Sequence, residues 1–344
     1  MRILLLYVSI LLFAGCNLFQ GQQPVEESAI VEEKQVETFV PVQKELYVIN
    51  PTTELYSAPD TTAKLNLKCE LGELVELEAE SKRFYKIKSP TDCYLLKENM
   101  GTYSEIPLTK EILEAVQELE EGEKEFDISK EGKNLSDYFT ISLISKQEYQ
   151  KELKNRVDFR TPIKNFTYKE GVLYINHQAY EVEKENIEWS NCEKVWWIAP
   201  LQRYLAYITY QGDVAYGFFI LIEKDTKETI KLEQEPFLSP DFKYLFCTTN
   251  PTYMNYTKIS LYNIQKDSIP LIEMVAQTEI NYWMPYHTKE TPLFFSSNGN
   301  IYASFNVEGL FWKGRKDVKL NDQRKYIKIG IRNSKLVNSI ITNL

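Results

Sequence analysis

The sequence predicts a mainly β fold, in which a small barrel and a larger, Tyr-rich β domain are joined by a short helical connector. Short segments in which apolar and polar residues alternate are separated by turn residues, which is typical of half-buried strands. The apolar spacing becomes helical only between residues 104 and 155, and a motif then recurs about 40 residues apart. We therefore assign residues 45–103 to the barrel, 104–155 to the connector and 156–344 to the larger domain.

The composition is that of a folded, exported protein. The chain has 344 residues, of which 43% are hydrophobic and 13% aromatic, and this length suffices for two domains. Its formal net charge is −9. Because nucleic acids bind to basic surfaces, this charge argues against a nucleic-acid partner and against electrostatic binding to anionic lipid.

The first residues have the pattern of an export signal. Arg2 is followed by an apolar run over residues 3–13 and by the tripeptide Ala-Gly-Cys that ends at Cys16. At 1.5 Å per residue the run spans about 16 Å, too little for a membrane core of about 30 Å. Small residues before a cysteine at this place resemble the processing site of bacterial lipoprotein signals. The resemblance implies removal of residues 1–15 and lipidation of Cys16.

Residues 16–44 are predicted to be an acidic, disordered tether. Between residues 17 and 43 the chain has five Glu and one Lys, and too few apolar side chains to form a core. A strand formed by the alternating Val and Ile residues is the second interpretation. The lipid on Cys16 would anchor the mature protein to a bacterial cell-envelope membrane, at the outer membrane or the periplasmic face.

The predicted barrel consists of short strands near residues 46–49, 55–58, 65–67, 75–79, 85–87 and 94–96. The order of its motifs resembles the bacterial SH3 (SH3b) family. The residues that carry this resemblance are Leu55 to Pro59, the Gly72-Glu73 turn, Phe84 to Ile87, and Cys93 to Leu95.

The SH3b resemblance implies a small SH3-like barrel that binds wall peptides or proteins through aromatic side chains. The matching positions are Tyr56, Tyr85 and Tyr94. Tyr85 alternates in phase with Ile87, which favours an inward orientation, and Tyr56 is the better candidate for the surface.

Apart from Cys16, the chain has four cysteines: Cys69, Cys93, Cys192 and Cys247. An even number in an oxidising compartment favours disulfides, and four cysteines allow three connectivities. Their order along the chain favours one pair per domain. The SH3b resemblance places Cys69 and Cys93 on neighbouring strands, which implies a bridge between them.

The connector is predicted to contain two helices. Thr109 is a suitable N-cap for a helix over residues 110–121. Ser145 and Glu148 have the spacing of a capping box, which predicts a second helix that continues through Leu153. The charged segment over residues 122–134 is interpreted as a loop.

The larger domain contains an internal repeat. The Ala-Pro pair at Pro200 recurs as the Ser-Pro pair at Pro240, and a third copy lies at residues 296–302. Each copy is followed by an apolar strand, and such a period is typical of propeller blades. The run from Ser239 to Lys243 is also similar to a turn of exported propeller repeats. We expect a propeller-like or meander domain, with a β-sandwich as the runner-up and a last strand over residues 327–331.

The sequence contains few residues suited to catalysis. His177 and His287 are the only histidines, and neither has Cys, His, Asp or Glu neighbours at a metal-binding spacing. Motifs for a serine nucleophile, a phosphate loop or a calcium loop are absent from the sequence. We therefore expect no enzyme activity, cofactor or metal.

These observations favour a membrane-anchored binding or adaptor protein whose partner is peptidoglycan or an envelope protein. A structural subunit of an envelope assembly is the first alternative. A divergent cell-wall hydrolase, or an accessory protein of one, is the second.

We expect Cys16→Ala to abolish lipidation, because the thiol that carries the lipid is lost. The measurement is metabolic labelling with palmitate. Wild-type protein should be labelled and membrane-bound, and the variant unlabelled and soluble or unprocessed. Labelling that survives the substitution would refute the lipoprotein interpretation.

Overall fold

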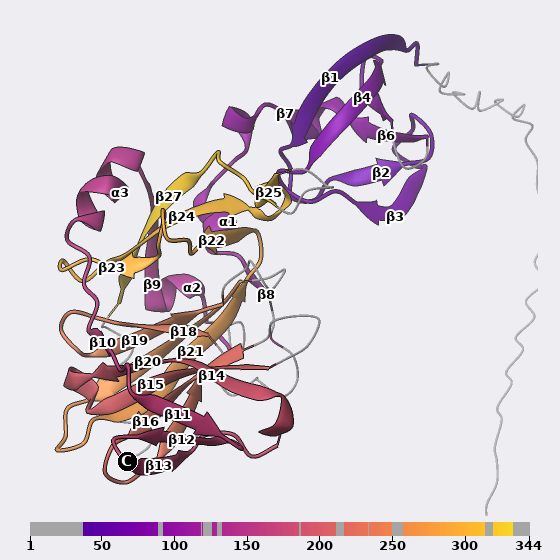
Figure 1. The fold of residues 1–344 in the computed structure, drawn as a ribbon. Helices are drawn as coiled ribbons and strands as arrows, with labels where there is room; N and C mark the ends of the chain where they lie inside the picture. The colour runs from indigo at the N-terminus through magenta and orange to yellow at the C-terminus, as the bar shows by residue number, and fades with distance from the viewer. Residues whose placement is uncertain are drawn as a thin grey trace, which may run out of the picture. The chain divides into compact units, whose positions relative to one another are not determined.

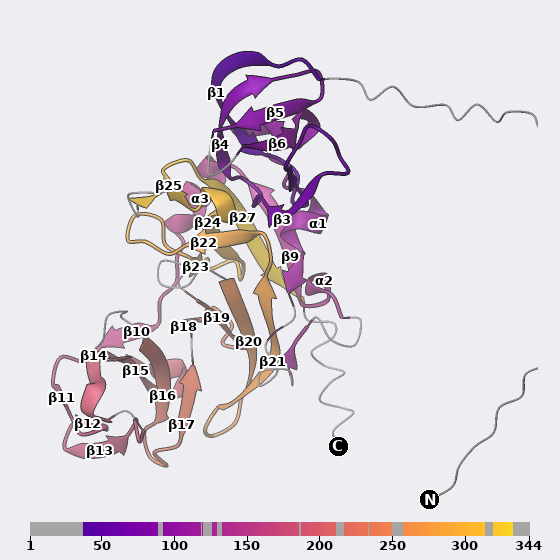
Figure 2. The same cartoon turned by 90° about the vertical axis from the view of Figure 1, so that its right-hand side faces the viewer.

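The structure, a computed structural model, is mainly β, which confirms the predicted fold class. Its paired strands are antiparallel, and no described sheet is closed into a barrel (Figure 1 and Figure 2). Cys16, residues 1–15 and most of the predicted tether lie outside the described residues. The described residues are 37–88, 92–117, 119, 126–128, 133–185, 187–210, 217–232, 234–249, 257–313 and 319–332.

The strands of the first sheet follow the order β3-β2-β6-β5-β4-β1-β7. In β4 the side chains alternate between exposed and buried, as a period of two predicts. The expected barrel is not closed, because β3 and β7 are end strands that do not pair with each other. The strands are β1 (Val40–Val48), β2 (Glu54–Tyr56), β3 (Lys64–Lys68), β4 (Leu74–Glu80), β5 (Phe84–Ile87), β6 (Cys93–Leu96) and β7 (Met100–Gly101).

The first strand begins within the segment that we assigned to the tether. Val40 and Pro41 pair with Glu80 and Ala79 of β4. Val42 packs against the core of this sheet, so the segment buries enough apolar surface to form a strand. From Val40 onward, the second interpretation of this segment is correct.

Helices and strands alternate between the first sheet and the C-terminal sheets. None of the helices in the described residues is long and apolar enough to cross a membrane. The elements in order are α1 (Lys110–Leu113), β8 (Val116–Gln117), α2 (Leu135–Tyr138), β9 (Phe139–Ile144) and α3 (Lys146–Leu153).

The two predicted helices have different outcomes. Ser145 accepts a hydrogen bond from the backbone N–H of Glu148 at 3.0 Å, and α3 forms as expected. The helix predicted over residues 110–121 ends after α1, because the chain then becomes β8 and pairs with β21. The indole of Trp283 donates a hydrogen bond to the carbonyl of Leu113 at 3.0 Å, so tertiary contacts outweigh helix propensity here.

Two consecutive four-stranded meanders, β14–β17 and β18–β21, make up much of the C-terminal part. β10 extends the first meander and β8 extends the second. The strands are β10 (Arg160–Pro162), β14 (Ser190–Ile198), β15 (Arg203–Tyr210), β16 (Gly217–Glu223), β17 (Thr229–Leu232), β18 (Glu235–Leu238), β19 (Tyr244–Thr248), β20 (Thr257–Gln265) and β21 (Leu271–Ile280).

A third sheet has the order β22-β24-β27-β9, and β23 also pairs with β24. Two small sheets contain β11 to β13 and the pair β25 and β26. The bounds are β11 (Phe166–Lys169), β12 (Val172–Ile175), β13 (Gln178–Glu181), β22 (Trp283–Tyr286), β23 (Phe294–Phe295), β24 (Ile301–Val307), β25 (Trp312–Lys313), β26 (Lys319–Leu320) and β27 (Lys325–Ile331).

The repeated motif forms a turn between two paired strands in each of the three larger C-terminal sheets. Pro200 lies in the turn between β14 and β15, Pro240 between β18 and β19, and Gly299 between β23 and β24. Each turn contains a hydrogen bond from a backbone N–H to the carbonyl three residues earlier. The segment predicted over residues 327–331 lies in β27, which pairs with both β24 and β9.

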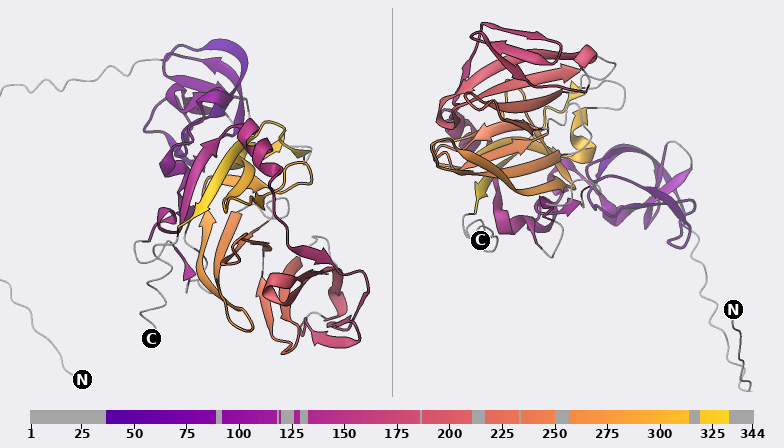
Figure 3. Two further views of the ribbon diagram at one scale, coloured as in Figure 1. Left: turned by 90° about the vertical axis from the view of Figure 1, so that its left-hand side faces the viewer. Right: turned by 90° about the horizontal axis from the view of Figure 1, so that it is seen from below.

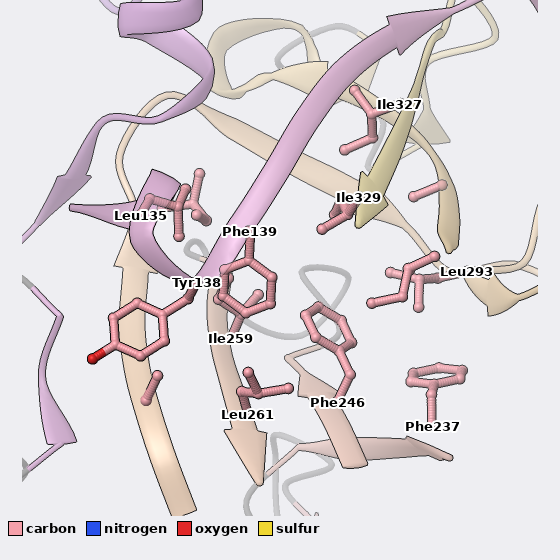
Figure 4. Packing of buried hydrophobic residues seen from close by; sticks show 14 of the residues in the cluster. Leu135, Tyr138, Phe139, Phe237, Phe246, Ile259, Leu261, Leu293, Ile327 and Ile329 are labelled. Carbon is pink, nitrogen blue, oxygen red and sulfur yellow. The ribbon is translucent and has the colours of Figure 1, made fainter. Parts of the chain in front are cut away.

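The largest apolar core joins the second meander to the third sheet. Figure 4 shows Phe139 of β9 and Phe246 of β19 close together, with Ile327 and Ile329 of β27 nearby. The rings of Phe139 and Phe246 pack edge to face with centroids 6.1 Å apart. Because β9 supplies Phe139, the segment between the two main β regions is part of this core.

A second apolar cluster joins the sheet of β1 to β7 to the sheet that contains β22, β24, β27 and β9. It contains Leu71, which follows β3, together with Val307 and Leu310 at the end of β24. The N–H of Gly309 donates a hydrogen bond to the carbonyl of Leu71 at 3.2 Å. A Cβ at Gly309 would lie only 2.5 Å from the backbone nitrogen of Glu73, so this contact requires glycine.

We expect Gly309→Ala to destabilise the fold by about 1–3 kcal/mol, because the added methyl group overpacks this contact. Urea unfolding measures the change. Gly299→Ala is the comparison, since Gly299 has φ +85° but open space around its Cβ position and should lose only about 1 kcal/mol through strain. A Gly309→Ala cost below that of Gly299→Ala would contradict the close approach.

Candidate functional site

Two of the three tyrosines assigned to a binding groove are buried. Tyr56 is 4% exposed and packs edge-on against Phe84, with ring centroids 5.9 Å apart. Its expected surface position is therefore wrong. Tyr85 is 7% exposed, in agreement with the inward orientation that its phase with Ile87 predicts. Tyr94 is half-buried and lies opposite Tyr56, where β2 pairs with β6.

Two cations cover the ring of Tyr85. The ammonium groups of Lys44 and Lys97 lie 4.8 and 4.9 Å from its centroid. Both also pair with Glu80 at 2.9 Å, and the hydrogen bonds from Lys97 and Lys44 lower the pKa of this carboxyl. The residues around Tyr85 thus satisfy one another and do not present its ring to a ligand.

The four cysteines after Cys16 lie in the described residues and form no disulfide there. β2 separates β3, which precedes Cys69, from β6, which carries Cys93, so the neighbouring-strand arrangement behind the expected bridge is wrong. Cys192 and Cys247 pack in different apolar clusters. Burial raises the pKa of the Cys192 thiol to about 12 and that of Cys247 well above its usual value, which makes both unreactive.

The two histidines have different surroundings. His177 is an exposed turn residue with φ +67°. His287 lies after β22, where its Nε2 is 2.8 Å from Glu235 and its Nδ1 accepts a hydrogen bond from the backbone N–H of Leu293 at 3.0 Å. With both ring nitrogens engaged, His287 has neither one available for a metal or a substrate proton. Among the described residues, no group of three or more Cys, His, Asp and Glu side chains is placed to hold a metal ion.

Glu235 is the centre of a charged cluster that the sequence analysis does not identify. Arg160 of β10 donates from Nη1 to Glu235 of β18 at 2.8 Å, and its guanidinium also pairs with Asp158. Although burial opposes its ionisation, the hydrogen bonds from His287 and Arg160 and the charge of Arg160 lower the pKa of Glu235 to about 2. The cluster therefore connects three sheets through a half-buried carboxylate.

The geometry suits this cluster to a structural role. The cavity beside Asp158 and Arg160 has a volume of about 20 Å³, enough for one water molecule. Its other walls are mainly apolar, and Phe237 packs edge-on against His287 with centroids 5.3 Å apart. A chemical reaction would need room for a substrate, which this cavity does not provide.

A larger hollow lies where β9 ends and β27 begins. Its volume is about 380 Å³, which is within the range of small-ligand sites. Three of its residues are cationic and one is acidic, and Leu143 contributes an apolar side chain that is 46% exposed. We call this site the basic hollow. It is lined by Leu108, Leu143, Ile144, Lys146, Asp322, Arg324, Lys325 and Tyr326.

Secondary structure places the backbone of Lys146 at the basic hollow, and hydrogen bonds hold the side chain of Arg324. Lys146 is the first residue of α3, whose N-terminus follows directly from β9. Arg324 donates to the carbonyl of Asn321 at 3.2 Å and to the hydroxyl of Thr291, so its guanidinium has a defined position. These residues are separated by about 180 positions in sequence, so no local motif could have indicated the site.

The third cation of the hollow lies over a tyrosine. The ammonium group of Lys325 is 4.6 Å from the ring centroid of Tyr103. The hydroxyl of Tyr103 is buried without a hydrogen-bond partner, and burial raises its pKa to about 12. Tyr103 therefore stays neutral beside the ammonium group of Lys325.

Comparisons of the chain with protein-family models, with curated proteins and with solved structures give no match.

Because the folded-state pKa of Glu235 lies below its ordinary value of 4.5, its ionised form stabilises the fold above pH 4.5. This contribution, about 2–3 kcal/mol, is lost as the pH falls from 4.5 to about 2. We expect Glu235→Gln to flatten the stability curve in this range, measured by urea unfolding at several pH values. The exposed Glu290→Gln is the control, and parallel curves for wild type and Glu235→Gln would contradict the assignment.

Proposed function

We propose that the protein is a lipid-anchored, non-enzymatic binding or adaptor protein of the bacterial cell envelope, whose partner places an acidic group in the basic hollow. The observation that carries the proposal is the convergence of Lys146, Arg324 and Lys325 beside apolar side chains. Two partner classes fit this chemistry. They are peptidoglycan peptides, which carry carboxylates, and acidic segments of an envelope protein.

The charge of the hollow supports an acidic partner. The chain as a whole has a net charge of −9, which disfavours general binding of anions. Three cations and one carboxylate line the hollow, which reverses the sign locally. Such complementarity directs a partner to one place more than it increases total affinity. A partner with both carboxylate and apolar groups would match these cations and Leu143.

The proposed lipid anchor and the proposed binding site rest on different observations. The anchor rests on the lipoprotein-like signal that ends at Cys16. The site rests on the hollow and not on the aromatic groove implied by the SH3b resemblance, because Tyr56 and Tyr85 are buried. A structural subunit of an envelope assembly would use the same hollow at a fixed stoichiometry.

We expect Lys146→Glu to weaken retention of the partner about tenfold, which corresponds to about 1.4 kcal/mol. Glu is favoured in the first turn of a helix, so the variant should fold. The mature protein is tested by pull-down against purified peptidoglycan and, separately, against detergent-solubilised envelope.

Lys151→Glu is the matched control, because Lys151 is an exposed residue of α3 that does not line the hollow. Equal retention of the Lys146→Glu and Lys151→Glu variants would contradict the proposed site. Turnover of peptidoglycan by the wild type would contradict the non-enzymatic assignment.

A further inference from the structure

β9 is an end strand whose outer edge pairs with no described strand. It pairs with β27 through six consecutive residue pairs, from Phe139 with Ile331 to Ile144 with Tyr326, and the register has no bulge. Figure 3 shows β9 and the yellow β27 side by side, with β9 at the border of the sheet. The outer edge of β9 therefore presents backbone N–H and C=O groups in a regular row.

β9 also lacks the usual protection of an end strand. Proteins block exposed edges with charged residues, prolines or bulges. The sequence of β9 is Phe-Thr-Ile-Ser-Leu-Ile, without a charge or a proline. Every other end strand of three or more residues in the described sheets contains a charged residue or a proline. These strands are β3, β10, β11, β13, β17, β18 and β22.

The open edge leads directly into the basic hollow. Leu143 and Ile144, the last two residues of β9, line the hollow, and Lys146 follows within two residues. Because β9 runs toward the hollow, a segment that pairs antiparallel with it begins at the hollow and runs away from it. The first residues of such a segment would lie beside the three cations.

We propose that β9 receives an extended segment of a partner protein, which adds to its edge as an antiparallel strand and places acidic residues from its N-terminal end in the basic hollow. This inference rests on the proposed function, since it names the partner of the same site. Backbone hydrogen bonds supply affinity in this mode, and the charges select the partner and its direction.

A second copy of this chain fits the site less well. Its β9 has no acidic residue to offer to the hollow, and two chains of net charge −9 repel each other. Peptidoglycan peptides fit the hollow but not the edge, because their mixed stereochemistry disfavours a regular strand. The open edge of β9 therefore favours a protein partner over a second copy of this chain and over peptidoglycan peptides.

The test uses the full mature chain and fluorescent synthetic peptides. The first peptide has Glu-Asp-Glu followed by six alternating Val and Thr residues; the second has the same residues in reverse order; the third has Lys in place of each acid. We expect the first peptide to bind at least tenfold more tightly than either of the others. Its binding should also slow amide hydrogen exchange in residues 139–144.

Two variants separate the edge from the hollow. Ser142→Lys adds a charge to the edge at an exposed position that does not line the hollow, and it should weaken the first peptide about tenfold. Thr161→Lys makes the corresponding change at an exposed position on the end strand β10 and should have no effect. Circular dichroism of each variant verifies that it folds.

The outcomes distinguish this inference from the proposed function. If the tripeptide Glu-Asp-Glu binds in a Lys146-dependent manner but the first peptide does not protect β9, the edge inference is wrong and the hollow assignment stands. If neither binds, both are wrong. If sedimentation shows that the protein alone forms a dimer that Ser142→Lys dissociates, the occupant is a second copy and the inference is again overturned.

Discussion

The antiparallel pairing of β9 with β27 is the interaction on which most of the C-terminal architecture depends. It joins residues 139–144 to the end of the described chain and adds Phe139 to the same core as Ile327 and Ile329. It also sets α3 against β24 and β27, where Tyr149 is fully buried and its hydroxyl donates to the carbonyl of Pro292 at 2.7 Å. The basic hollow exists because this pairing brings the end of β9 to the beginning of β27.

Polar contacts then fix how the sheets meet. Arg160 forms an ion pair with Glu235 and His287 donates a hydrogen bond to it, so each of the three sheets that meet there contributes a group to one polar network. Ion pairs that are shielded from water add little net stability compared with apolar packing, but removing one partner from a half-buried pair such as Arg160 and Glu235 leaves the other charge poorly solvated. An arrangement of the sheets that separated Arg160 from Glu235 would therefore be strongly disfavoured. We interpret this network as a set of contacts that favours one arrangement of the three sheets over others.

Local patterns predicted the strands well, and long-range contacts account for the errors. The period of two in β4 and the repeated turns at Pro200 and Pro240 depend on neighbouring residues, which the sequence displays. The end of α1 depends instead on Trp283, about 170 residues away. Likewise, the burial of Tyr56 depends on packing against Phe84, and the position of β2 between β3 and β6 depends on the strand order of the whole sheet. The basic hollow combines residues between positions 108 and 146 with residues between positions 322 and 326, so the sequence alone does not indicate it.

Two carboxylates with opposite pKa shifts contribute opposite responses of the fold to acid. Burial, with the nearby charges of Glu70 and Glu279, raises the pKa of Glu308 to about 7. The folded state thus favours protonated Glu308, and stability declines as the pH rises from 4.5 toward 7. Glu235 has the opposite dependence below pH 4.5, where its ion pairs weaken. Since Glu308 adjoins Gly309 at the contact with Leu71, mild acidification strengthens this junction before stronger acid weakens the contacts between the C-terminal sheets.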